Sequence, residues 1–221
     1  MSTKAYLTGL VAVAGLAGAA SGDIVSSSFD DGDEGWVVSN GANEAQESNT
    51  GLPMFFSQNG NGGGFISAPT NWGMQSFLVA PDAFHGDHSD KFGGSIEVDR
   101  RHIEPRFSVD PLQVDYAVDV TISGASMTLA VGLDPVSLVA WESFSVPLNA
   151  AGGWFHLDTD VAATDAEIAM VLGSLEDLRV RANINDRINN IGVDNIMLVP
   201  APGSAALLAL AGLTAARRRR N

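Results

Sequence analysis

Apolar and polar residues alternate strictly through the middle of the chain, and this pattern predicts β-strands. Residues 113–122 read QVDYAVDVTI, where Val114, Tyr116, Val118, Val120 and Ile122 share one face. The segments MTLAVGL (127–133) and LRVRANIN (178–185) alternate in the same way. A period of two turns one apolar face toward a core and one polar face outward. Shorter candidates, separated by Gly, Asn, Asp and Pro, are SFLVA, GSIEVDR, VAWESFSV, WFHLDTD and GVDNIMLV.

One segment has helical rather than strand periodicity. In TDAEIAMVLGSL, Thr164 and Glu167 have capping-box spacing, and apolar residues then recur at i, i+3, i+4 and i+7: Ile168, Val171, Leu172 and Leu175. We expect a short helix whose apolar stripe packs on a sheet edge. A partner-binding face is the alternative.

Eight or more strands with one short helix predict an all-β fold, an antiparallel β-sandwich of jelly-roll form over residues 23–199. About 180 residues can bury one core. The chain has no cysteine, which excludes disulfides, thiolate catalysis and cysteine zinc sites. Residues 39–65 form a long stretch rich in Gly and Asn, and such loops often cover ligand surfaces.

Both ends of the chain have the features of targeting segments. Residues 1–22 hold one Lys, an apolar run and then small residues, which predicts a signal peptide; an uncleaved anchor is the alternative. Residues 200–221 hold Pro200 and Pro202, a short apolar run, and four basic residues, Arg217, Arg218, Arg219 and Arg220. An apolar run followed by arginines predicts a marginal transmembrane helix with the arginines in the cytoplasm.

The C-terminal segment resembles a PEP-CTERM sorting tail in its Pro-x-Pro element, apolar run and Arg cluster, with Ala201 at the position that is Glu in the family motif. This resemblance implies export and cleavage near the prolines by an exosortase-type membrane protease. It also implies transient anchoring in the inner membrane, and a final place at the cell surface or in the extracellular matrix of a Gram-negative-type bacterium. An ordinary tail anchor is the alternative.

The charge of the predicted exported part disfavours nucleic-acid binding. Without Lys4 and the terminal arginines, 7 basic residues remain against 26 acidic ones, a formal charge of −19. Such a surface repels phosphate backbones and anionic lipid, and it attracts cations.

Acidic residues at the two ends of the predicted domain suggest a structural Ca²⁺ site. The stretch FDDGDEGW holds Asp30, Asp31 and Asp33, and Asp194 lies in GVDNI. Because the first and last strands of a jelly roll commonly pair, we expect Asp30 to face Asp194. Carboxylate and carbonyl oxygens are the ligands that calcium prefers. A solvated acidic turn is the alternative.

Other candidate groups lack a supporting motif, and the sequence predicts that the chain is not an enzyme. A loop holds metal-ligand types without a third histidine nearby: His85, Asp87, His88 and Asp90. Possible glycosidase carboxylates lack a supporting motif: Glu97, Glu104 and Glu142. No nucleophile elbow or phosphate-binding loop is present.

Aromatic residues are candidates for stacking on sugars. Trp72, in the turn-rich stretch PTNWGM, is the best candidate for an exposed ring, with core packing as the alternative. We expect the other tryptophans, Trp36, Trp141 and Trp154, to lie in the core.

The succession of motifs from residue 29 to 199 is similar to the laminin B (laminin IV type A) domain. Its most specific part is a series of eight residues: Ala80, Pro81, Phe84, Gly86, Asp87, Phe92, Gly93 and Gly94. The resemblance implies a galactose-binding-like jelly roll and a structural or adhesive module of surface and matrix proteins, with extracellular polysaccharide or surface proteins as partners. The alternatives are a carbohydrate-binding module and a secreted glycoside hydrolase.

Overall fold

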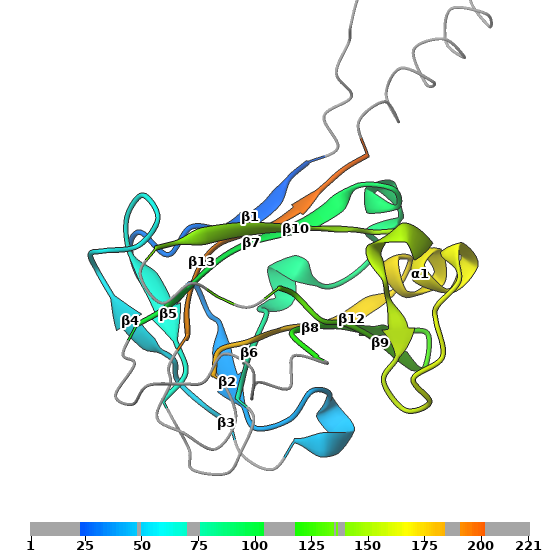
Figure 1. Cartoon of the computed structure of the whole chain (residues 1–221), viewed down its shortest axis with the longest axis horizontal. Helices are drawn as coiled ribbons and strands as arrows, with labels where there is room; N and C mark the ends of the chain where they lie inside the picture. The colour runs from blue at the N-terminus through cyan, green and yellow to red at the C-terminus, as the bar shows by residue number, and fades with distance from the viewer. Residues whose placement is uncertain are drawn as a thin grey trace, which may run out of the picture. The chain divides into compact units, whose positions relative to one another are not determined.

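Two antiparallel sheets face each other in the part of the chain that the structure describes (Figure 1). The computed structural model describes residues 23–47, 50–69, 76–103, 118–134, 136, 140–183 and 191–201. These residues fall within one compact unit, 21–202. Several predictions on the sequence lie outside the described residues: the signal peptide, Trp72, Glu104, and the tail from Pro202 through Arg220.

The six-stranded sheet has β13 at its centre, and the seven-stranded sheet has β12 between β8 and β6. The six-stranded sheet runs in the order β10 (Glu142–Pro147), β7 (Ser95–His102), β13 (Ile191–Val199), β5 (Phe65–Ser67) and β4 (Met54–Phe56), and β1 (Val25–Ser27) also pairs with β13. The seven-stranded sheet runs in the order β11 (Phe155–His156), β9 (Met127–Val131), β8 (Val120–Gly124), β12 (Leu175–Arg181), β6 (Phe77–Val79), β2 (Val37–Ser39) and β3 (Thr50–Gly51).

The core lies between the two sheets and uses the apolar faces that the alternation predicts. Val120 and Ile122 of β8 lie opposite Val180 and Leu178 of β12, and all four are fully buried. Trp36 is buried in this core and packs edge-to-face against Phe29 and Phe84, at ring-centroid distances of 6.0 and 5.3 Å. Burial of these side chains is the main stabilising term of a fold without disulfides.

The polar face of β12 is buried, although alternation predicts that it faces solvent. Arg179 is 1% exposed because residues 40–47, which include the short 3₁₀ helix η1 (Glu44–Gln46), cover the outer face of the seven-stranded sheet. Arg179 Nη1 donates to Ser39 Oγ and to the Gly41 carbonyl, each at 3.0 Å. Thr121 Oγ1 donates to the Ala42 carbonyl at 2.8 Å.

A fully buried ion pair joins the two sheets. Arg100 of β7 donates through Nη2 to Asp119 Oδ1 at 2.7 Å, and both side chains are 0% exposed. Asp119 directly precedes β8, and its Oδ2 accepts the backbone N–H of Leu133 at 2.9 Å. Alternation predicts Asp119 on the polar face of a strand, but this contact places its carboxylate in the interior.

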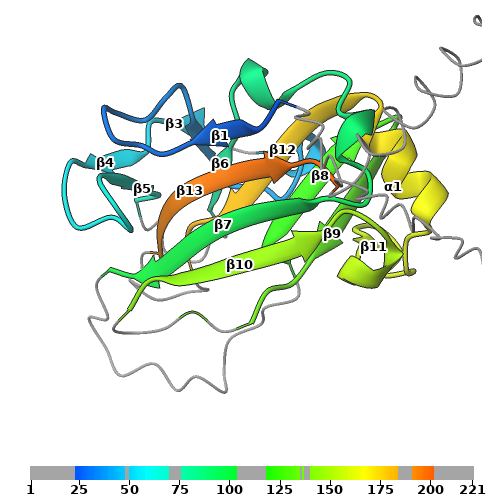
Figure 2. The same cartoon turned by 90° about the horizontal axis from the view of Figure 1, so that it is seen from above.

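The predicted helix is confirmed as α1 (Asp165–Leu172), which packs against β8 and lies at one end of the sandwich (Figures 1 and 2). Thr164 Oγ1 accepts the Glu167 N–H at 3.3 Å, and Glu167 Oε2 accepts the Thr164 N–H at 2.8 Å. The capping box is therefore complete. Ile168, Val171 and Leu172 are buried, so the apolar stripe is a packing face.

Thr164→Ala is expected to lower the free energy of unfolding by about 1 kcal/mol, because the first turn of α1 loses its cap. Urea unfolding followed by circular dichroism measures the change. Thr164→Ser is the matched control, since it keeps the hydroxyl acceptor. Equal destabilisation in both variants would contradict the assignment to the cap.

Among the described residues, no helix is long and apolar enough to cross a membrane.

Candidate functional site

The first and last described strands pair, as the sequence predicts, and this pairing brings Asp30 near Asp194. β1 runs antiparallel to β13 with Val25 opposite Leu198 and Ser27 opposite Ile196. The two strands lie side by side in both views of the sandwich (Figures 1 and 2). Asp30 follows β1 by three residues, and the charge on its carboxylate contributes to raising the pKa of Asp194.

The glycine-rich loop 59–64 closes over these two carboxylates. A Cβ atom at Gly63 would lie 1.7 Å from Asp30 Oδ1, and one at Gly60 would lie 2.7 Å from Asp194 Oδ2. At Gly64 a Cβ atom would lie 2.2 Å from the Phe29 carbonyl oxygen. Backbone approach at this distance leaves no room for a side chain, which explains the run of glycines in NGNGGGF.

The loop lies against three carboxylates, which we call the acidic clasp: Asp30, Asp99 and Asp194. Hydrogen bonds tie it to two of them, Asp99 and Asp194. The Asn61 N–H donates to Asp194 Oδ2 at 2.6 Å, and the Asn195 N–H donates to Asp194 Oδ1 at 2.8 Å. Asp99 Oδ2 accepts from the side-chain amides of Asn61 and Asn195, each at 2.8 Å. The clasp therefore fixes the loop to β7 and β13.

Asp194 is a buried carboxyl group of the clasp with a raised pKa. It is 1% exposed, and burial raises its pKa from 3.8 to about 6. The N–H groups of Asn61 and Asn195 oppose this shift, while the charges on Asp99 and Asp30 add to it. A buried carboxylate beside two others is costly to ionise, and the two N–H donors stabilise the charged form.

Asp99 is a member of the clasp that the sequence reasoning missed. It lies opposite Asp194 in the antiparallel ladder of β7 and β13, so both project from the same face. The available signal was the GSIEVDR alternation, which sets Glu97 and Asp99 on one face, but no local pattern specifies the register of β7 against β13.

The clasp as it stands does not fit the predicted Ca²⁺ shell. Within the described part of the chain, no three His, Cys, Asp or Glu side chains are arranged to hold a metal ion. N–H donors already occupy both carboxylate oxygens of Asp194, which calcium would need. A calcium shell is built from oxygen ligands, so these donors would first have to be displaced. Calcium binding at Asp30, Asp31, Asp33 and Asp194, which the sequence predicts, would require the loop to rearrange.

The other acidic residues of FDDGDEGW stabilise the turn that follows β1. Glu34 Oε1 accepts the N–H groups of Phe29 and Ser28 at 2.6 and 3.2 Å. Asp33 Oδ1 accepts the Gly35 N–H at 3.1 Å. Asp31 is exposed. For these residues the geometry is that of the alternative, a solvated acidic turn.

Excess calcium, compared with a chelator, is expected to leave the melting temperature of the chain unchanged. A cation that binds the folded form would raise it by mass action. Differential scanning calorimetry of the wild type and of the Asp30→Ala/Asp194→Ala double variant makes the measurement. A calcium-dependent rise of several degrees that disappears in the double variant would establish the predicted shell and contradict the donor argument.

Next to the clasp, an open groove of about 440 Å³ runs over the outer face of the six-stranded sheet. Five of its seven lining residues have polar side chains, Glu97, Asp99, Ser143, Ser145 and Asn195, and the other two are Phe144 and Met197. We call this the polar groove.

Trp141 lies one residue before β10 and is half-buried, which corrects the prediction of a core position. Its Nε1–H donates to the Asn59 carbonyl at 2.9 Å. The Arg101 guanidinium lies 4.9 Å from its ring centroid, and Phe65 packs edge-to-face at 5.4 Å. Gly192 permits this packing, since a Cβ atom there would lie 3.0 Å from both aromatic rings. The indole therefore has a fixed position outside the core.

The remaining candidates have structural roles. Trp36 and Trp154 are core residues as predicted, and their Nε1–H groups donate to Ser27 Oγ and the Pro147 carbonyl. The loop that holds His85 and His88 forms local contacts instead of a zinc site. In it Asp87 Oδ1 accepts the Ser89 N–H at 3.0 Å, Asp90 pairs with Lys91, and His85 lies 3.6 Å from Asp82.

Comparison with known proteins agrees with this architecture. Residues 77–211 match the Laminin B (Domain IV) family. A solved structure, the L4b domain of human laminin alpha-2, is similar to this chain with a TM-score of 0.61 and 11% sequence identity. The similarity covers 80% of this chain and 97% of that one. At this identity the likeness establishes the fold, a mostly β sandwich of two antiparallel sheets with one short helix. No curated protein matches. Because the matched region spans more than half of its residues, the chain belongs to the Laminin B (Domain IV) family.

Proposed function

We propose that this chain is an exported, non-catalytic binding module that acts structurally or adhesively at the cell surface or in the extracellular matrix of a bacterium. Laminin B domains are non-catalytic modules, which supports the absence of an enzymatic role. In this proposal the sandwich is a galactose-binding-like jelly roll, residues 1–22 are a signal peptide, and residues 200–221 are a sorting tail for an exosortase-type protease.

The polar groove is the observation that carries the proposal. It is an open surface on a sheet, whereas a catalytic site of the glycosidase type needs two carboxylates poised across a cleft, one with a raised pKa. Asp194, whose pKa is raised to about 6, accepts hydrogen bonds from two N–H groups beneath the loop. An open surface lined by both polar and apolar side chains suits contact with a macromolecule.

The export part of the proposal is tested by mass spectrometry of the protein recovered from the surface of bacteria that express it. The expected mature form begins near residue 23 and ends near Pro200. A variant with Arg217–Arg220 replaced by alanine is expected to keep its C-terminal segment uncleaved, whether the protein is released or retained by the cell. Recovery of the full chain from the cytoplasm would overturn the proposal.

A carbohydrate-binding module is the second candidate, and Trp141 favours it. A half-buried aromatic ring held in a fixed position next to the Arg101 guanidinium is an arrangement that suits a sugar ring. Affinity electrophoresis through soluble xylan, galactan and β-glucan tests this candidate.

For a sugar site, retardation of the wild type is expected to be lost in Trp141→Ala and kept in Phe55→Ala. Phe55 is the matched control because it is an aromatic residue of β4 with 39% exposure. If the wild type is not retarded in any of the three gels, the carbohydrate-binding role is contradicted and the structural or adhesive role is the one that stands.

A further inference from the structure

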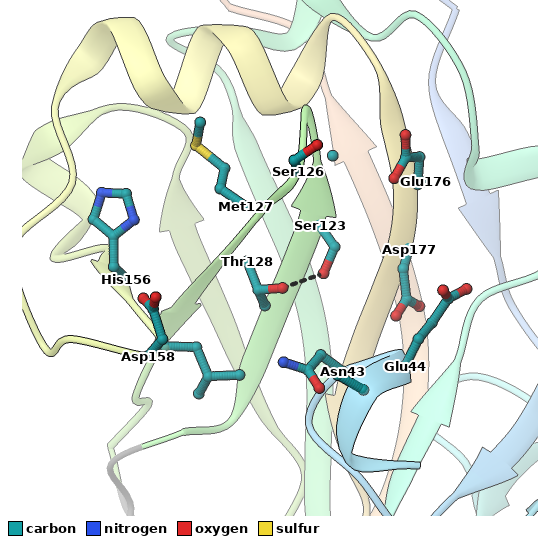
Figure 3. A pocket seen from close by; sticks show the side chains of 13 residues that line it. Asn43, Glu44, Ser123, Ser126, Met127, Thr128, His156, Asp158, Glu176 and Asp177 are labelled. Atoms are coloured by element: carbon teal, nitrogen blue, oxygen red, sulfur yellow. Dashed lines mark hydrogen bonds between the residues drawn. The ribbon is translucent and has the colours of Figure 1, made fainter.

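A second cavity, of about 390 Å³, opens on the opposite side of the sandwich, on the outer face of the seven-stranded sheet. It lies beside η1, and Figure 3 shows side chains from η1, β8, β9 and β12 around it. The volume lies in the range of small-molecule sites, roughly 300–1,000 Å³. The residues that the argument uses are Asn43, Glu44, Ser123, Thr128, Asp158 and Asp177.

Asp177 is a buried carboxylate with an unsatisfied oxygen in the wall of this cavity. Its side chain is 5% exposed, and its Oδ2 accepts from Arg179 Nε at 2.5 Å. Its Oδ1 has no hydrogen-bond partner. Burial raises the pKa of Asp177, and Arg179 opposes that shift. A buried polar atom without a partner costs free energy, which a ligand that donates a hydrogen bond would recover.

The charge around the cavity selects a cation. Glu44, Asp158 and Glu176 line it together with Asp177, and no lysine or arginine is among its lining residues. Arg179, behind Asp177, is engaged through all three nitrogens by Asp177, Ser39, Gly41 and Glu47. His156 lies 3.2 Å from Glu167 of α1. In Figure 3 the carboxylates of Glu44 and Asp177 lie toward one another, and Asp158 lies across the cavity.

Hydroxyl groups form the part of the cavity between these carboxylates. Ser123 Oγ and Thr128 Oγ1 of the β8–β9 hairpin are 2.9 Å apart and share a hydrogen bond (Figure 3). Asn43 uses its side-chain oxygen to accept the Gln46 N–H, so its amide NH₂ group remains as a donor. Such a lining suits a ligand with several hydroxyl groups as well as a positive charge.

We propose that this cavity binds an amino-sugar unit with a free ammonium group. The ammonium donates to the carboxylates of Asp177 and Glu44, and the ring hydroxyls bond to Ser123, Thr128 and Asn43. Charge-assisted hydrogen bonds to a desolvated carboxylate are the strong ones, so the ammonium supplies most of the selectivity. The site is distinct from the polar groove, and its test is independent of the tests proposed there.

Isothermal titration calorimetry of the full chain tests the site with a short, fully deacetylated glucosamine oligomer. The N-acetylated oligomer of the same length is expected not to bind, because it has no ammonium group. Glu44→Gln/Asp158→Asn is expected to weaken binding of the deacetylated oligomer about tenfold or more, since it removes one charged acceptor of the ammonium and a second negative charge in the cavity lining. Asp23→Asn/Asp31→Asn is the matched control, because it removes the same charge from exposed residues outside the cavity.

Three results would overturn the proposal. The first is equal binding of both oligomers, and the second is equal weakening in the cavity variant and in the control. The third is binding of a lysine oligomer that equals that of the glucosamine oligomer and depends equally on Glu44 and Asp158, which would assign the cavity to basic peptides. Binding of the deacetylated oligomer to Asp177→Asn tests the buried carboxylate separately from the exposed ones. The melting temperature of this variant, measured in parallel, shows whether it is folded.

Discussion

Asp119→Ala is expected to lower the free energy of unfolding by about 3–5 kcal/mol, because it leaves the Arg100 guanidinium buried without a counter-charge. Both side chains are 0% exposed. Arg100 Nε and Nη1 already have no hydrogen-bond partner, so Asp119 provides the hydrogen bond that the guanidinium has in the interior. The substitution also leaves the Leu133 N–H without its acceptor. Urea unfolding monitored by tryptophan fluorescence measures the effect.

The double variant Arg100→Met/Asp119→Leu is the control for this effect. It removes both charges and fills the space with apolar groups, so we expect most of the lost stability to return. Arg100 contacts the Phe144 ring at 5.9 Å, and methionine keeps an apolar contact there. If the double variant is as unstable as Asp119→Ala, the pair acts through packing instead of charge.

The second large effect is expected in the pH dependence of stability, through Asp194. Its pKa is 3.8 in the unfolded reference and about 6 in the folded chain. Between these values the folded state holds a proton that the unfolded chain has released. Its contribution to the free energy of unfolding therefore falls as the pH rises from about 4 to about 6, by about 3 kcal/mol in total.

The measurement compares wild type with Asp194→Asn across this pH range, with a chelator present. The comparison is needed because other groups titrate in the same range, among them His102, whose pKa burial and the nearby Arg100 lower to about 4. We expect the stability of the wild type relative to Asp194→Asn to fall between about pH 4 and about pH 6. A difference that does not change with pH would mean that Asp194 ionises normally in the folded chain.

The sequence predicts the architecture well where alternation is strong. The faces assigned to Val120, Ile122, Leu178 and Val180 are the buried ones, and the capping box at Thr164 begins α1. The prediction fails for Arg179, because a period of two in the sequence indicates only which residues share a face of the strand. Whether that face meets solvent depends on residues 40–47, far away in the chain, and no local pattern encodes their position.

The candidate sites were only partly predictable for the same reason. The pairing of the first and last strands places Asp30 near Asp194, as expected, but the third member, Asp99, depends on the β7–β13 register. Asp177 and Glu44 come from β12 and η1 and carry no shared motif. Trp141 follows a strand-like pattern, and its place outside the core depends on Gly192 of a different strand.

The β1–β13 ladder has a mechanical consequence. Residues 24 and 200 leave it at the same end, since Val25 lies opposite Leu198. A force pulling these two points apart loads the hydrogen bonds one after another, so the pair unzips at low force. A different geometry applies if the chain is tethered only at the end that follows β13 and the force acts on a ligand bound in the polar groove. The force then runs along β13 and loads the β7–β13 ladder in shear. This ladder spans Ile191 to Val199. Many hydrogen bonds then share the force at once, so the domain resists traction from a single tether far better than stretching between its two ends.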